Sequence, residues 1–223
     1  MKNTKLSELC EMAQQRSNVY GLLAVIYGQE PTEEFLREMK KIGLVKGLLD
    51  LGFQFEEDFL KKPENELALE LAVEFARLFL GPDKHISPYE SVYHKREGEQ
   101  GLLWGEVTVE VKKMIEASGL QFKKDYGGIP DHIGIELEFM SKLIRKEKQA
   151  WKKKDVATAI KLLKIEKRFI DEHLSMWVPL FCEKIIGEAK LNFYREMAKL
   201  TKEFILSEGK EITQLIRNFK EIK

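Results

Sequence analysis

The stretch ENELALELAVEFARLFL, from Glu64 to Leu80, carries the pattern that decides the fold class. Its apolar residues recur every three or four positions, at Leu67, Leu71, Phe75 and Leu78. This spacing places side chains on one face of an α-helix. Similar spacing runs through most of the chain, whereas alternating strand-like patterns are scarce. We therefore expect an all-α fold, with this helix in the core.

The same periodicity predicts the other helices, which are separated by glycine and proline. They cover residues 5–27, a short segment that opens at 31–32, and residues 44–51, 106–118, 130–151 and 191–222. A further long helix starts at Asp155 and is expected to kink or break at Pro179. The last helix is expected to be interrupted at Ser207 to Gly209. We predict one helical-bundle domain over residues 1–223, with a long functional loop at 81–105 that offers a hinge.

The composition of the chain argues against several classes of protein. The 223 residues contain 37 Lys and Arg and 37 Asp and Glu, so the formal net charge is zero. A dedicated nucleic-acid binder needs an excess of cations, so we expect no nucleic-acid partner. Cys10 and Cys182 form no CxxC pair, which fits a reducing cytoplasm. We see no secretory signal and no apolar run of about 18 residues, and so expect a cytoplasmic protein that does not insert into a membrane.

Two motifs contain more specific chemistry than a helical core requires. The first, RLFLGPDKHISPYESVY, spans Arg77 to Tyr93 and enters the 81–105 loop. The second, IPDHIGIELEFM, spans Ile129 to Met140 and opens a helix with Pro130 as its first residue. The loop exceeds the roughly 12–15 residues usual for structureless connections, which favours a functional role.

Several individual residues allow more than one interpretation. His132 and Glu136 are four apart on one helix face, so they are either two metal ligands or an ordinary hydrogen-bonded pair. Asp131 is either a helix-start residue stabilised by the helix dipole or part of a ligand site. His173 reads as a core histidine, and His85 and His94 have no partner that spacing can identify.

The aromatic residues of the loop are equally open to two readings. Tyr89, Tyr93 and Trp104 either pack the loop or line an apolar groove for a peptide. No P-loop, HExxH, GxSxG or Rossmann glycine pattern is present, so no common enzyme class is supported.

Taken together, the two motifs resemble the TorD/DmsD family of redox-enzyme-maturation chaperones. RLFLGP followed by PYESVY resembles the loop motif of that family, and PDHIGIELEFM resembles its helix-opening motif. GLLWGEVT, at 101–108, resembles the glycine-bearing link between them. The resemblance covers roughly residues 68–204. Tyr89 departs from the pattern, because many relatives carry tryptophan there.

The resemblance implies an all-helical chaperone rather than an enzyme. Its expected partner is the catalytic subunit of a molybdopterin oxidoreductase, whose twin-arginine leader or apoprotein it would hold until the cofactor is inserted. A receptor for such a leader needs carboxylates beside an apolar groove. The expected carboxylates are Glu90, Asp131, Glu136 and Glu138. The expected groove residues are Leu78, Phe79, Tyr89, Tyr93 and Trp104. The resemblance also assigns ligand binding to the Asp131-His132 pair.

Other outcomes stay open at this level. Some relatives bind guanine nucleotide weakly, but no phosphate-binding glycine loop is present here, and we expect no cofactor. One alternative is a metal-binding or enzymatic protein built on His132 and Glu136. Another is a helical scaffold that dimerises through apolar faces. A homodimer is also compatible with the chaperone reading, since relatives exchange helices between chains.

Overall fold

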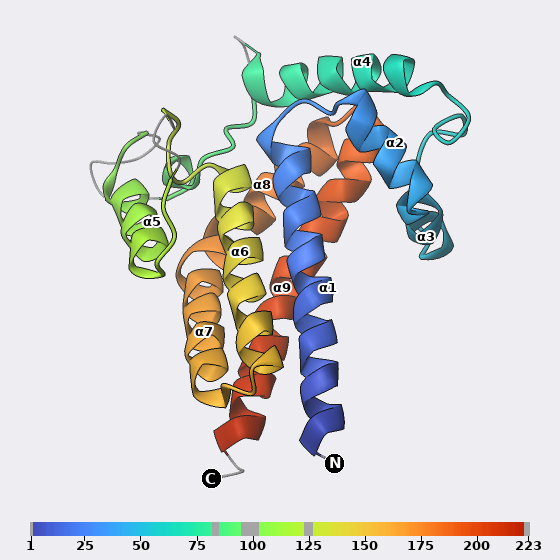
Figure 1. The fold of residues 1–223 in the computed structure, drawn as a ribbon. Helices are drawn as coiled ribbons and strands as arrows, with labels where there is room; N and C mark the ends of the chain where they lie inside the picture. Colours follow the sequence, from blue (N-terminus) through green and yellow to red (C-terminus); the bar gives the residue numbers. More distant parts are fainter. Residues whose placement is uncertain (1, 82–84, 95–102, 123–126, 221–223) are drawn as a thin grey trace. The chain divides into compact units, whose positions relative to one another are not determined.

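The structure is a computed structural model that describes residues 2–81, 85–94, 103–122 and 127–220. Its α-helices are α1 (Lys2–Gly28), α2 (Glu33–Lys41), α3 (Leu44–Asp50), α4 (Glu64–Phe75), α5 (Glu106–Ala117), α6 (Ile133–Lys152), α7 (Val156–Phe169), α8 (Ser175–Glu188) and α9 (Asn192–Lys220) (Figure 1). The described residues also contain three short helical turns. Two are π-helical, η1 (Ala76–Leu80) and η3 (Ile170–Leu174), and one is a 3-10 turn, η2 (Glu90–Val92). The described residues contain one isolated β-bridge and no strand. The all-α prediction is confirmed.

Two expected helix breaks are wrong. Pro179 lies inside α8 and does not break it, whereas the kink expected there stays a prediction; the π-helical turn η3 falls earlier in the chain. The expected interruption at Ser207 to Gly209 is absent, because α9 runs through these residues. A β-carbon on Gly209 would stand 3.4 Å from the Ile170 side chain, so α9 packs against η3 at this glycine and continues past it.

The chain forms two compact units, which we describe separately. Unit 1 holds the described residues of Met1–Gly28, Tyr89–Val178 and Phe204–Lys223, and unit 2 holds Gln29–Pro88 and Pro179–Glu203. One boundary between them falls between Pro88 and Tyr89, inside the 81–105 loop. None of the helices in the described part of the chain has the length and apolar character needed to cross a membrane.

Unit 1 is built around α6, which packs along α1 and also against α7 (Figure 1). The helices α1 and α6 are in close contact at two glycines. A β-carbon on Gly134 would lie 2.8 Å from the Gly28 Cα atom and 3.2 Å from its nitrogen. Because both obstructing atoms belong to the backbone, this crossing requires glycine at position 134. The contact fixes where the second sequence motif meets α1.

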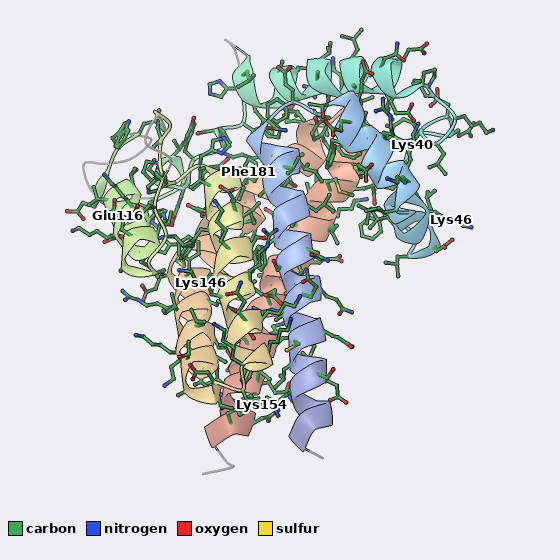
Figure 2. The ribbon with its side chains drawn as sticks, in the orientation of Figure 1. Lys40, Lys46, Glu116, Lys146, Lys154 and Phe181 are labelled. Carbon is green, nitrogen blue, oxygen red and sulfur yellow. The ribbon has the colours of Figure 1, made fainter. Side chains whose placement is uncertain are left out.

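Unit 2 contains α2, α3, α4 and η1, and its core is aromatic. Phe59 stacks on Phe193, with ring centroids 5.7 Å apart. Phe79 stacks on Phe181, labelled in Figure 2, at 5.9 Å. The Tyr194 hydroxyl donates to the Leu71 carbonyl at 3.0 Å, which satisfies its polar end. The apolar face predicted for the 64–80 helix is therefore part of this core.

Candidate functional site

The first motif begins with two buried residues of unit 2. Leu78 is 1% exposed and Phe79 is 4% exposed. Phe79 also contacts Phe75 and Tyr194, with ring centroids 5.0 and 6.2 Å apart. The Ile86 N–H donates to the Leu78 carbonyl at 2.7 Å, so Ile86 lies beside η1. These two expected groove residues lie in the core of unit 2, away from solvent.

In unit 1 the structure brings the two motifs together through the backbone. Tyr89 and His132 form the antiparallel bridge, and the Glu90 N–H donates to the Asp131 carbonyl at 3.0 Å. The Tyr89 and His132 rings meet edge to face, with centroids 5.1 Å apart. Both side chains are partly exposed. Residues 43 positions apart in the chain thus form one surface.

Asp131 is fully buried and stabilises this junction. Its Oδ2 atom accepts a hydrogen bond from the Ser91 N–H at 2.8 Å. Its Oδ1 atom and the Ser91 hydroxyl are buried without a hydrogen-bond partner among the described residues. The helix α6 starts at Ile133, three residues later than expected, so Asp131 precedes the helix and ties the loop to it.

His132 is the N-cap residue of α6. Its Nδ1 atom accepts a hydrogen bond from the Gly134 N–H at 3.0 Å, which places the ring proton of the neutral imidazole on Nε2. Burial lowers the pKa of His132 to about 4, although the neighbouring Asp131 opposes this change. At neutral pH the side chain is therefore an uncharged ring with an Nε2–H donor.

Glu90 is completely buried and is held by two histidines. The Nδ1 atom of His173 lies 2.9 and 3.1 Å from its two oxygens, and the Nε2 atom of His94 lies 2.8 Å from one of them. Burial by itself raises the pKa of Glu90, but the hydrogen bonds from His173 and His94 outweigh it and the pKa is lowered. Glu90 therefore stays ionised.

Glu136 lies beside Glu90 and behaves in the opposite way. It is fully buried, and its Oε2 atom accepts a hydrogen bond from the Trp177 indole N–H at 3.1 Å. Burial, and then the adjacent Glu90 carboxylate, raises the pKa of Glu136 well above its ordinary value. The carboxyl is protonated at neutral pH, as expected for two like charges in one buried site.

His132 and Glu136 each form a hydrogen bond with a different partner. His132 is bonded to the Gly134 backbone and Glu136 to Trp177. Among the described residues, no group of three His, Cys, Asp or Glu side chains is arranged to hold a metal ion.

The remaining expected site residues occupy three different environments. Tyr93 lies against Trp177, with ring centroids 5.2 Å apart. Trp104 is 60% exposed and has a left-handed backbone, with φ of 67°. Glu138 is exposed and pairs with Lys142 at 2.8 Å. Glu138 also lines a cavity of about 370 Å³ between α5 and α6, with walls that are largely apolar: Ile115, Leu120, Phe122, Ile135 and Phe139.

Sequence reasoning missed the roles of His94 and His173. His173 is 83 positions from Glu90, so no local spacing links them. The same two histidines also line a cavity of about 620 Å³ in unit 1, together with Arg168 and Lys113. For His94 the available signal was its spacing of four residues from Glu90. For His173 there was none, because the burial of Glu90 is visible only in the fold.

Comparisons of the sequence with known proteins identify its relatives. The chain is 27% identical over 209 residues to the chaperone protein TorD of Vibrio parahaemolyticus, covering 87% of this chain and 93% of the relative. It is 26% identical over 223 residues to the chaperone protein TorD of Vibrio cholerae, covering 95% and 98%.

A solved structure shares the fold. It is described as a redox enzyme maturation protein from Archaeoglobus fulgidus and matches with a TM-score of 0.53 and 19% identity, covering 85% of this chain and 93% of that one. The family model described as nitrate reductase delta subunit matches residues 48–183, more than half of the chain. The chain therefore belongs to the nitrate reductase delta subunit family, the TorD family of redox-enzyme-maturation chaperones.

Proposed function

We propose that this protein is a cytoplasmic, non-enzymatic chaperone that binds the twin-arginine leader of a molybdopterin oxidoreductase catalytic subunit. It would hold that subunit until its cofactor is inserted. Family membership supports the chaperone role and the kind of client. The observation that carries the proposal for the leader is the junction of Tyr89 with His132, because it presents an aromatic ring and a neutral N–H donor on one surface.

The buried carboxyls of this site lie beneath the surface formed by Tyr89 and His132 and hold it in place. Glu90, Asp131 and Glu136 are each 0% exposed. A guanidinium group cannot reach them in this conformation without displacing the side chains above. We therefore assign these three residues a positioning role: they fix the loop and the start of α6 beneath Tyr89 and His132.

The exposed groups have the chemistry that a leader requires. The Nε2–H of His132 can donate to a backbone carbonyl of an extended peptide. Glu138, on the same helix, places a carboxylate at the edge of an apolar cavity. A twin-arginine leader combines guanidinium groups with an apolar segment of about 7–15 residues, and arginine binds carboxylates in a bidentate manner that lysine cannot match.

Isothermal titration of the full chain with a synthetic leader tests the proposal. We expect a twin-arginine leader to bind, and a version with lysine at both positions to bind at least about tenfold more weakly, a difference of about 1.4 kcal/mol. Equal binding of the two peptides, or no binding of any molybdoenzyme leader from the same genome, would refute leader recognition.

Single substitutions, with a matched control, identify which residues contact the leader peptide. Tyr89→Ala and Glu138→Gln should weaken binding, whereas Glu116→Gln should not, because Glu116 is an exposed glutamate on α5 that does not line the apolar cavity (Figure 2). Circular dichroism of each variant establishes that the fold is intact.

A further inference from the structure

A buried ion cluster, which we call the Arg16 cluster, joins four helices of unit 1. The guanidinium of Arg16, on α1, contacts three glutamates. It donates to Glu147 of α6 at 2.9 Å, to Glu166 of α7 at 2.6 Å, and to both oxygens of Glu208 of α9 at 2.9 and 3.0 Å. The glutamate side chains are 1%, 0% and 2% exposed, respectively. The cluster is separate from the Tyr89 and His132 surface.

The formal charges in this cluster do not balance. One guanidinium faces three carboxyls, and Arg16 is the one Lys or Arg that pairs with any of them among the described residues. Fully ionised carboxyls would leave a net charge of −2 in a dry interior. Such uncompensated charge is strongly disfavoured, and like charges sharing a site raise the pKa of at least one member.

The hydrogen bonds show which carboxyl lacks partners. The Trp151 indole N–H donates to Glu147 at 2.6 Å, and Arg16 donates to both oxygens of Glu208. Glu166 receives one bond on Oε2, while its Oε1 atom is buried with no hydrogen-bond partner among the described residues. A proton on Oε1 would turn this unsatisfied acceptor into a donor.

We infer that the Arg16 cluster is a proton-binding site, in which the folded protein holds one proton at neutral pH, carried by Glu166 and directed toward Glu147. The proton reduces the negative charge of the cluster from −2 to −1. The Glu147 carboxyl is one of the groups that interact with Glu166, so it is the group to which this proton would be donated. The four helices are then joined by a network with fewer unpaired charges.

The electrostatics of the surrounding groups support this assignment. Burial raises the pKa of Glu166 to about 8, although Arg16 opposes the change. The pKa values of Glu147 and Glu208 are also raised, again mainly by burial. Among the described residues, Tyr20 of α1 and Glu211 of α9 also interact electrostatically with the cluster. Neither supplies a positive charge.

The proton makes the stability of unit 1 depend on pH. The pKa of Glu166 is raised in the folded state, so its contribution is fully present below the unfolded value of about 4.5 and is lost as pH rises through about 8. For one proton, the folding equilibrium constant falls about tenfold for each pH unit between these values.

Carbon-13 NMR of glutamate side chains in the full chain tests the inference directly. We expect one carboxyl resonance to keep its protonated shift at pH 7 and to titrate near pH 8, and to be missing from Glu166→Gln. If every glutamate carboxyl is ionised at pH 7 outside the Glu90 and Glu136 site, the inference is wrong. Glu136→Gln identifies the resonance of that other site.

Chemical denaturation gives a second readout. Glu166→Gln carries a neutral amide that cannot ionise. Between pH 5 and 8 the folding equilibrium constant of the wild-type protein should therefore fall faster than that of the variant, and the difference should be about tenfold per pH unit. Glu11→Gln, at an exposed position on α1, should follow the wild type. Parallel pH dependence of all three proteins would overturn the inference. If Glu166→Gln does not fold, the NMR titration of the wild type decides the question alone.

Discussion

At the scale of single residues, the environment gives two identical side chains opposite protonation states. Glu90 and Glu136 are both fully buried and lie next to each other. Glu90 receives hydrogen bonds from His94 and His173 and stays ionised, whereas Glu136 receives one from Trp177 and is protonated. The pair therefore carries a single negative charge, on Glu90, and this charge holds the loop that carries Tyr89.

The two glutamates should respond differently to the same isosteric change. Glu90→Gln removes a buried charge from its two histidine partners and should lower the free energy of unfolding by about 3 kcal/mol at pH 7. Glu136→Gln replaces a neutral carboxyl with a neutral amide and should change it by less than about 1 kcal/mol. Urea denaturation measures both, and equal losses would contradict the assignment.

The pH dependence of Glu136→Gln follows from its raised pKa. A carboxyl with a raised folded pKa contributes stability at low pH that is lost as pH rises through that pKa. The wild-type protein should therefore lose stability in alkaline solution relative to Glu136→Gln. A variant that becomes the less stable of the two at high pH would show that Glu136 is ionised in the folded state.

His132 leads to a prediction about peptide binding. Because the pKa of His132 is about 4, the ring keeps the same neutral state between pH 5.5 and 8. If it donates through Nε2, the affinity for a leader peptide should be constant over that range and should fall for His132→Ala. Titration calorimetry in matched buffers measures it. Binding that strengthens below pH 6.5 would instead indicate a charged histidine.

At the scale of helices, the crossing of α1 and α6 depends on a missing side chain. Gly134 belongs to the motif that carries Asp131 and His132, and its position against Gly28 leaves no room for a β-carbon. The N–H of the same glycine donates the capping hydrogen bond to Nδ1 of His132. Helix packing and the geometry of the candidate site are thus coupled at one residue.

Gly134→Ala should therefore destabilise the protein by about 1–3 kcal/mol, the usual cost of overpacking against a fixed neighbour. Gly187→Ala is the matched control, because no atom lies within 4 Å of a β-carbon there and alanine favours a helix by up to about 1 kcal/mol. In thermal denaturation, Gly134→Ala should lower the Tm and Gly187→Ala should raise it. Loss of stability in both would mean that helix packing at Gly134 is not the cause.

At the scale of the whole molecule, the chain passes between two compact units four times, and α8 and α9 each contribute to both. The prediction of one domain with a hinge at 81–105 stays a prediction, as does homodimer formation. Neither is needed for the proposed site, since Tyr89, His132 and Glu138 all belong to unit 1.

Binding of a leader should raise the stability of the whole chain. A ligand that binds the folded state at 100 times its Kd adds about 2.7 kcal/mol to the free energy of unfolding. A thermal-shift experiment with a twin-arginine leader should therefore show a higher Tm than the lysine version at the same concentration. An unchanged Tm with both peptides would count against the proposed function.

The sequence by itself determined the all-α class, most helix positions and the family. These properties depend on local spacing of apolar residues and on short motifs, both of which are readable along the chain. The π-helical turns η1 and η3 and the continuity of α9 were not readable, because tertiary contacts can override local preferences such as that of Gly209.

Tertiary structure alone decided what the site residues do. Sequence grouped Glu90, Asp131, Glu136 and Glu138 as carboxylates for a ligand, but burial separates the first three from exposed Glu138. Leu78 and Phe79 proved to be core residues, and the histidines that hold Glu90 lie 4 and 83 positions away. Exposure and the pKa of a buried group depend on neighbours from distant segments, which no local pattern encodes.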